Sequence, residues 1–123
     1  MSLRHISLIL EAEVLAGHNL LERHITGFYA TDMMSRVLAL SPSGTLLLTT
    51  LTNIQVINTA EVAGLGGVIF LEGKRPAIEV VEKAKKLSVP VLVTRHSGLE
   101  AGRILAKGRS EERRVGKECR SRW

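Results

Sequence analysis

Residues 43–73 carry the hydrophobic pattern of one strand-helix-strand unit. The continuous apolar run 46–48 follows the turn signal Ser43-Gly44, and a second apolar run, 68–71, follows later in the same stretch. Runs of this kind are typical of parallel strands that are covered on both faces. The two runs therefore predict neighbouring parallel strands joined by a crossover helix.

The crossover helix is expected to begin at about Asn53, because Thr52 and Gln55 have the spacing of a capping box. Gly64 stands where a helix commonly ends in a left-handed conformation. The spacing of apolar residues between these ends predicts a buried stripe made of Ile54, Val56, Ile57, Ala60 and Ala63.

Short apolar runs and helical patterns alternate along the rest of the chain. Helical spacing favours a first helix at 3–11, although a short strand also fits this segment. Thr31 or Asp32 is expected to cap a helix that carries Met33, Val37 and Leu40 on one side. The remaining predicted elements are strands at 14–16, 25–30 and 91–93, a helix with the apolar face Ala77, Val80, Val81, Ala84 and Leu87, and a helix capped by Ser97 with Glu100 that ends near Lys107.

This order of elements predicts one α/β domain over residues 1–108. We expect a three-layer architecture, in which a mostly parallel sheet of about five strands has helices on both faces. A doubly wound arrangement is expected rather than a barrel, because five strands are too few to close one.

Charge and composition add limits on partners and compartment. Residues 109–123 carry a net charge of +3 out of the +5 of the whole chain, so the high pI does not indicate a nucleic-acid-binding domain. This segment has one aliphatic residue, Val115, and is expected to be a disordered basic tail that resembles translated vector read-through. Residues 1–108 contain no cysteine and no apolar run long enough for a membrane span, so we expect a cytoplasmic protein without a membrane partner.

Polar and charged residues gather where the predicted parallel strands end. In an open parallel sheet, ligands bind beyond the carboxyl ends of the strands, where the strand order reverses. In this chain, each loop that follows a predicted parallel strand also precedes a predicted helix. Backbone amides and helix N-termini favour an anion there, so a phosphate or carboxylate group is expected. The simpler interpretation of each single residue is a helix cap or a solvated charge. The candidate ligand-binding residues are Asp32, Thr50, Thr52, Asn53, Glu72, Gly73, Arg95, His96 and Ser97.

Catalytic chemistry finds little support in the sequence. His96 and Ser97 are neighbours, but there is no nucleophile elbow at this point. His18 and His24 have no third metal ligand near them, and a phosphate-binding loop of NTPases is absent. The chain is therefore expected to be no enzyme, with no metal and no cofactor.

The segments TGFYATDMMSRVLAL, GTLLLTTLTNIQVINTAEVAGLGGVIFLEGKRP and AKKLSVPVLVTRHSGLEAGRIL resemble the DRTGG domain family, over about residues 25–107. The resemblance implies an α/β fold similar to the N-terminal domain of HPr kinase, which lies apart from the catalytic domain of that enzyme. Family members occur fused to CBS, phosphotransacetylase or pyrophosphatase modules and as short stand-alone proteins, and this chain resembles the short stand-alone subgroup more than the fused members. The resemblance therefore implies a regulatory role, with nucleotide or phospho-ligand sensing through a homodimer.

The residues that give the family its name are altered in this chain. Leu51-Thr52-Asn53 replaces a Gly-Asp-Arg motif, and Leu71-Glu72-Gly73 replaces a Thr-Gly-Gly motif, so that only Gly73 matches. Asp32 matches the aspartate that precedes a Met-Met or Leu-Leu-Ser segment in relatives. The leading hypothesis is a dimeric, non-catalytic regulatory module that senses a phosphorylated or other anionic small ligand. The alternative is an interaction or scaffolding domain for a metabolic or redox enzyme, without a small-molecule ligand.

Overall fold

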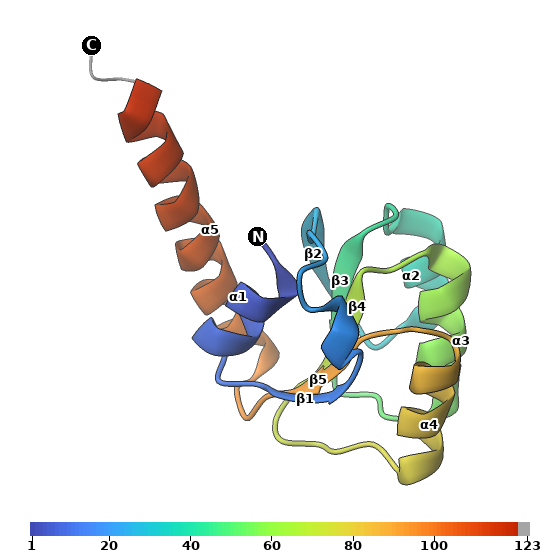
Figure 1. Ribbon diagram of the computed structural model, residues 1–123. Helices are drawn as coiled ribbons and strands as arrows, with labels where there is room; N and C mark the ends of the chain where they lie inside the picture. The colour runs from blue at the N-terminus through green and yellow to red at the C-terminus, as the bar shows by residue number, and fades with distance from the viewer. Residues whose placement is uncertain (121–123) are drawn as a thin grey trace.

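The computed structural model describes residues 1–120, with side chains described through Ser110 (Figure 1). Helices and short strands alternate along the chain, as the hydrophobic pattern predicts. The elements are α1 (Leu3–Ile9), β1 (Glu13–Ala16), the 3-10 helix η1 (His18–Leu20), β2 (Gly27–Ala30), α2 (Met34–Leu40), β3 (Thr45–Thr49), α3 (Ile54–Ala63), β4 (Gly67–Phe70), α4 (Ile78–Lys86), β5 (Val91–Val93) and α5 (Gly98–Arg120).

All five strands form one sheet in the order β1-β5-β4-β3-β2. The pairs β2–β3, β3–β4 and β4–β5 are parallel, whereas β1 runs antiparallel to β5, with Glu13 opposite Val93. The predicted mostly parallel α/β sheet is thus confirmed. The doubly wound arrangement is wrong, because β2 to β5 follow one another across the sheet in chain order and the winding never reverses.

Helices cover both faces of the sheet. Because the three crossovers all advance in the same direction, right-handedness puts α2, α3 and α4 on one face, while α1 and α5 lie on the other (Figure 1). Successive side chains of each strand point to opposite faces and so enter two different cores. Leu47, Val68 and Phe70 face α2–α4, whereas Leu46 and Ile69 face α1 and α5. Each such side chain contributes about 1.5–3 kcal/mol to folding, which explains why continuous apolar runs form these strands.

Helix α3 begins where the sequence predicts but not for the predicted reason. Asn53 is the N-cap and makes no side-chain capping bond, so the expected capping box of Thr52 and Gln55 does not form. Ile54 is 43% exposed, because the first residue of the helix points away from the sheet. Gly64 does adopt the left-handed conformation, with φ of 67°, that ends the helix.

The cap predicted for α2 is also wrong, and its predicted apolar face is confirmed only at Val37. The N-cap is Met33, without a side-chain capping bond, and the Asp32 carboxylate turns to β3 instead. Met34 and Val37 are buried, whereas Met33 and Leu40 are 57% and 59% exposed. The buried stripe therefore passes through a different set of helical positions from the one predicted.

Helix α5 confirms its predicted cap but continues further than predicted. The backbone N–H of Glu100 donates to the Ser97 hydroxyl at 3.2 Å. The helix then runs to Arg120 rather than ending near Lys107, because the added segment consists mainly of Glu, Arg and Lys, which favour helix, and has no proline. Residues 121–123 lie outside the described part of the chain, and the non-native origin expected for residues 109–123 stays a prediction. Among residues 1–120, no helix is long and apolar enough to cross a membrane.

Candidate functional site at the carboxyl edge of the sheet

The loops after β2, β3, β4 and β5 meet at one edge of the sheet, because these strands are parallel. Two groups of predicted residues lie along this edge. Asp32, Thr50, Thr52 and Asn53 follow β2 and β3, and Glu72, Gly73, Arg95, His96 and Ser97 follow β4 and β5. The turn between α1 and β1 joins the second group, because antiparallel β1 begins at this edge.

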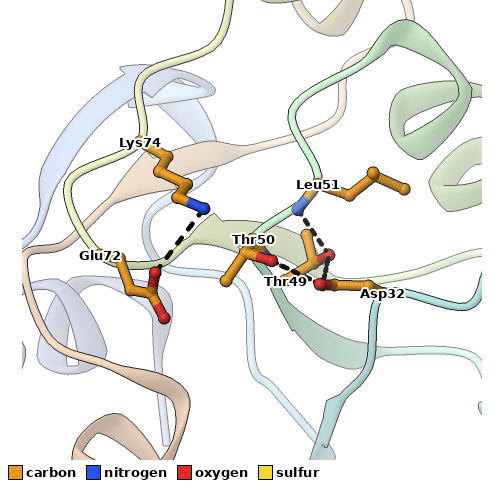
Figure 2. A network of polar contacts seen from close by, with 6 residues as sticks. All are labelled: Asp32, Thr49, Thr50, Leu51, Glu72 and Lys74. Atoms are coloured by element: carbon orange, nitrogen blue, oxygen red, sulfur yellow. Dashed lines mark hydrogen bonds and ion pairs between the residues drawn. The ribbon is translucent and has the colours of Figure 1, made fainter.

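Asp32 is held by the end of β3 (Figure 2). The Thr49 hydroxyl donates to Asp32 Oδ1 at 2.6 Å, the Thr50 backbone N–H donates to the same oxygen at 2.8 Å, and the Thr50 hydroxyl donates to Oδ2. Partial burial raises the pKa of Asp32, but these hydrogen bonds lower it by more, so the pKa lies below its ordinary value. Asp32 is therefore a charged carboxylate that braces two loops and repels a nearby anion.

Backbone amides at this edge contribute less to an anion site than the sequence predicts. The N–H groups of Glu72 and Gly73 donate to the carbonyl oxygens of His96 and Thr94, at 2.9 and 2.8 Å. The N–H of Leu51 donates to the Thr49 hydroxyl at 3.1 Å. An amide that already has a protein acceptor offers little to a ligand. Side-chain cations must then supply most of the attraction for an anion.

A cavity of about 300 Å³ lies at the β1–β5–β4 end of this edge, lined by Glu11, Glu13, Gly73, Arg75, Val93, Thr94 and Arg95. Gly73 and Arg95 belong to the predicted site. The two glutamates were missed, because a four-residue strand pattern does not reveal that β1 runs antiparallel and starts here.

The charges in this cavity are mixed. Arg75 donates to both carboxylate oxygens of Glu13, at 2.7 and 3.1 Å. The same contact lowers the pKa of Glu13 and raises the pKa of Arg75. Arg95 forms no ion pair with any side chain described through Ser110. Arg95 is therefore the cation that this cavity leaves open to a ligand, and Glu13 competes for Arg75.

The remaining predicted residues have local roles. Lys74 Nζ lies 3.7 Å from Glu72 Oε1, and Figure 2 shows this pair in the same view as Asp32 and Thr50. His96 Nδ1 lies 4.0 Å from Glu100 Oε1, and the Ser97 hydroxyl caps α5. His96 and Ser97 thus have separate partners and form no described hydrogen bond with one another. Within the described residues, no three His, Cys, Asp or Glu side chains gather as a metal site would require.

Comparison with solved structures finds a similar fold in the regulatory region of an enzyme. The similar chain comes from the crystal structure of the CBS and DRTGG domains of the regulatory region of Clostridium perfringens pyrophosphatase, complexed with its activator diadenosine tetraphosphate. The TM-score is 0.70 at 20% sequence identity, and the match covers 84% of this chain and 45% of that chain. The present chain thus spans less than half of that chain, and the likeness shows a shared fold.

Comparison with curated proteins finds no match. The model of the DRTGG domain family, in contrast, matches residues 5–116, which is most of the chain. The chain therefore belongs to the DRTGG domain family.

Proposed function

We propose that this chain is a non-catalytic regulatory domain that binds a nucleotide or another phosphorylated small molecule at the carboxyl edge of its sheet and acts as a homodimer. The observation that carries the proposal is the cavity at the end of β5, which is lined by Arg95, a cation without an ion pair among the side chains described through Ser110. A related fold occurs in a regulatory region that is complexed with a dinucleoside polyphosphate. Guanidinium groups bind phosphate oxygens through paired hydrogen bonds, so Arg95 suits such a ligand.

Mixed charge makes this site selective rather than strongly attractive. Glu11 and Glu13 line the cavity together with Arg75 and Arg95, so a diffuse attraction of anions is not expected. A phosphate would have to reach Arg95 directly and share Arg75 with Glu13. The Asp32 carboxylate, which keeps spare lone pairs, suits a hydroxyl donor such as a sugar rather than a phosphate.

A thermal-shift panel with adenine nucleotides, dinucleoside polyphosphates and phosphosugars tests this proposal. A ligand that raises the melting temperature of the wild type should act at least about tenfold more weakly on Arg95→Gln, since a hydrogen bond to a charged group is worth about 1.5–3 kcal/mol. The control is Lys85→Gln, which removes one charge from the last turn of α4, where the chain leads into the start of β5 at the opposite edge of the sheet. A wild type that no compound stabilises at millimolar concentration would contradict the proposal.

A second candidate function is a protein-interaction domain without a small-molecule ligand. The observation that favours it is one side of α2, where Met33 and Leu40, seven positions apart, are 57% and 59% exposed. Large apolar side chains gathered on one element often mark contact surfaces. Sedimentation velocity on the wild type and on a Met33→Ser/Leu40→Ser variant tests this surface. Loss of a defined partner protein by this variant, together with a wild type that no nucleotide stabilises, would support the second function.

A further inference from the structure

A second cavity lies between the sheet and α5, away from the carboxyl-edge cavity described above. Its volume is about 430 Å³. Phe28 and Leu48 of β2 and β3 line one side, and Gly102, Leu105, Ala106 and Arg109 of α5 line the other. Ligand pockets commonly span roughly 300–1,000 Å³ and are mostly apolar with a few polar groups. This cavity has that size and that composition.

The cavity exists because of where α5 packs and which residues α5 carries. The helix packs against α1, where a Cβ on Gly108 would lie 2.9 Å from the side chain of Ile9. This contact draws α5 toward α1 and away from the edge strand β2 (Figure 1). At Gly102 a Cβ would meet no atom within 4 Å, so the missing side chain leaves space that a larger residue would fill. Glycine in the middle of a helix is otherwise unfavourable.

Arg109 gives this apolar cavity one charged group. Arg4, Arg75 and Arg103 each lie within an ion-pair distance of a glutamate, whereas Arg109 pairs with no side chain described through Ser110. Its guanidinium is therefore available to an anion at the cavity, and its planar donors match a carboxylate or a similar oxyanion. Apolar walls and one free cation are complementary to a molecule that has an apolar body and one negative charge.

We propose that the cavity between β2, β3 and α5 binds a small amphipathic organic anion, whose apolar body lies on Phe28, Leu48 and Leu105 and whose charged group meets Arg109. The anion site at the carboxyl edge plays no part in this binding, because none of its lining residues borders this cavity. The proposal is therefore independent of the function proposed above.

Fluorescent probes test the proposal on the full chain. The probe is 8-anilinonaphthalene-1-sulfonate, an aromatic body with one negative charge, and its uncharged counterpart is N-phenyl-1-naphthylamine. The wild type should bind both probes saturably at one site. Arg109→Gln should weaken the anionic probe about tenfold and leave the neutral probe within about twofold, since only the former loses a charge-assisted contact.

Gly102→Leu is the blocking variant, because its side chain enters open space without a backbone clash. It should abolish saturable binding of both probes while circular dichroism and the melting temperature show a folded protein. Arg103→Gln removes a charge from the same helix at a residue that does not line the cavity, and should leave both probes unaffected.

Three results would overturn the proposal. If folded Gly102→Leu binds the probes as well as the wild type does, the probes bind elsewhere. The same conclusion follows if Arg109→Gln and Arg103→Gln lose equal affinity for the anionic probe. A wild type that sediments as a dimer, binds no probe saturably and becomes monomeric in Gly102→Leu would assign the cavity to a second copy of the chain instead.

Discussion

The Thr49 hydroxyl donates a hydrogen bond of 2.6 Å to Oδ1 of Asp32, which ties the end of β3 to the loop that follows β2. Thr49 is buried at the last position of β3, so the carboxylate is fixed by a rigid element. The Thr49 oxygen also accepts from the backbone N–H of Leu51 at 3.1 Å. One hydroxyl therefore orders two of the loops at the carboxyl edge.

We predict that Asp32→Ala destabilises the domain by about 1–2 kcal/mol at neutral pH, because three donors lose a charged acceptor. The pKa of Asp32 lies below its ordinary value in the folded state. The contribution of the Asp32 carboxylate to the free energy of unfolding is therefore present above the unfolded-state pKa and is lost as the pH falls through the folded-state pKa. Urea unfolding of the wild type and of Asp32→Ala at several pH values between 7 and 3 measures this difference in stability.

The control for this prediction is Asp32→Asn, which keeps one acceptor oxygen without the charge. It should lose less stability than Asp32→Ala at neutral pH, and its difference from the wild type should also shrink in acid. A difference between wild type and Asp32→Ala that stays constant from pH 7 to pH 3 would show that the charged carboxylate is not the cause.

We predict opposite effects of Glu13→Gln and Arg95→Gln on phosphate binding at the carboxyl edge. Glu13 holds Arg75 through two hydrogen bonds, so removal of its charge frees a second cation in the cavity. Arg95→Gln removes the cation that is already free. With ATP and diadenosine tetraphosphate as titrants in calorimetry, Glu13→Gln should lower the Kd and Arg95→Gln should raise it, each by about tenfold.

Stability separates a local charge effect from misfolding in these two variants. The Arg75–Glu13 pair is solvent-exposed, and exposed pairs contribute little to folding, so both variants should melt close to the wild type. Weaker binding in both variants would mean that Glu13 supports the ligand instead of competing with it.

The hydrophobic pattern predicted β3, β4 and β5 because each is buried on both faces and so reads as an unbroken apolar run. It did not predict the direction of β1. The pattern of this four-residue strand, from exposed Glu13 to buried Ala16, does not show whether the strand runs parallel or antiparallel to its neighbour. Its pairing with β5 is a contact between distant parts of the chain. The one-way winding of the sheet likewise depends on the pairing of strands rather than on their composition.

That the candidate residues follow strands ending at one edge of the sheet was predictable, because parallel strands end at a common edge. The hydrogen-bond and ion-pair partners of these residues were harder to predict. The amides of Glu72 and Gly73 turn toward carbonyl oxygens of the next loop because both residues have positive φ, 60° and 68°. A glutamate in this conformation has no sequence signal. The Arg75–Glu13 pair joins residues 62 positions apart, and only the folded chain reveals it.

We predict that the same substitution has opposite effects at Gly73 and Gly102. A Cβ would meet no atom within 4 Å at either position, so packing does not decide the result. Gly73 has φ of 68°, and Gly73→Ala should cost about 1–2 kcal/mol, because side chains disfavour this conformation. Gly102 lies inside α5, and Gly102→Ala should gain about 0.8–1 kcal/mol. Equal shifts of the two variants in chemical unfolding would contradict this backbone argument.

Thr94 joins the core to the carboxyl edge. Its side chain is 2% exposed, and its hydroxyl donates to the carbonyl oxygen of Leu10 at 2.8 Å, at the end of α1. Thr94→Val keeps the shape but leaves that carbonyl without its donor, so we predict a loss of about 1–3 kcal/mol in the free energy of unfolding. Thr94→Ser keeps the hydroxyl and loses one methyl group, which should cost only about 1 kcal/mol. Urea unfolding of both variants decides the point: if Thr94→Val is the more stable of the two, burial of the methyl group outweighs the hydrogen bond.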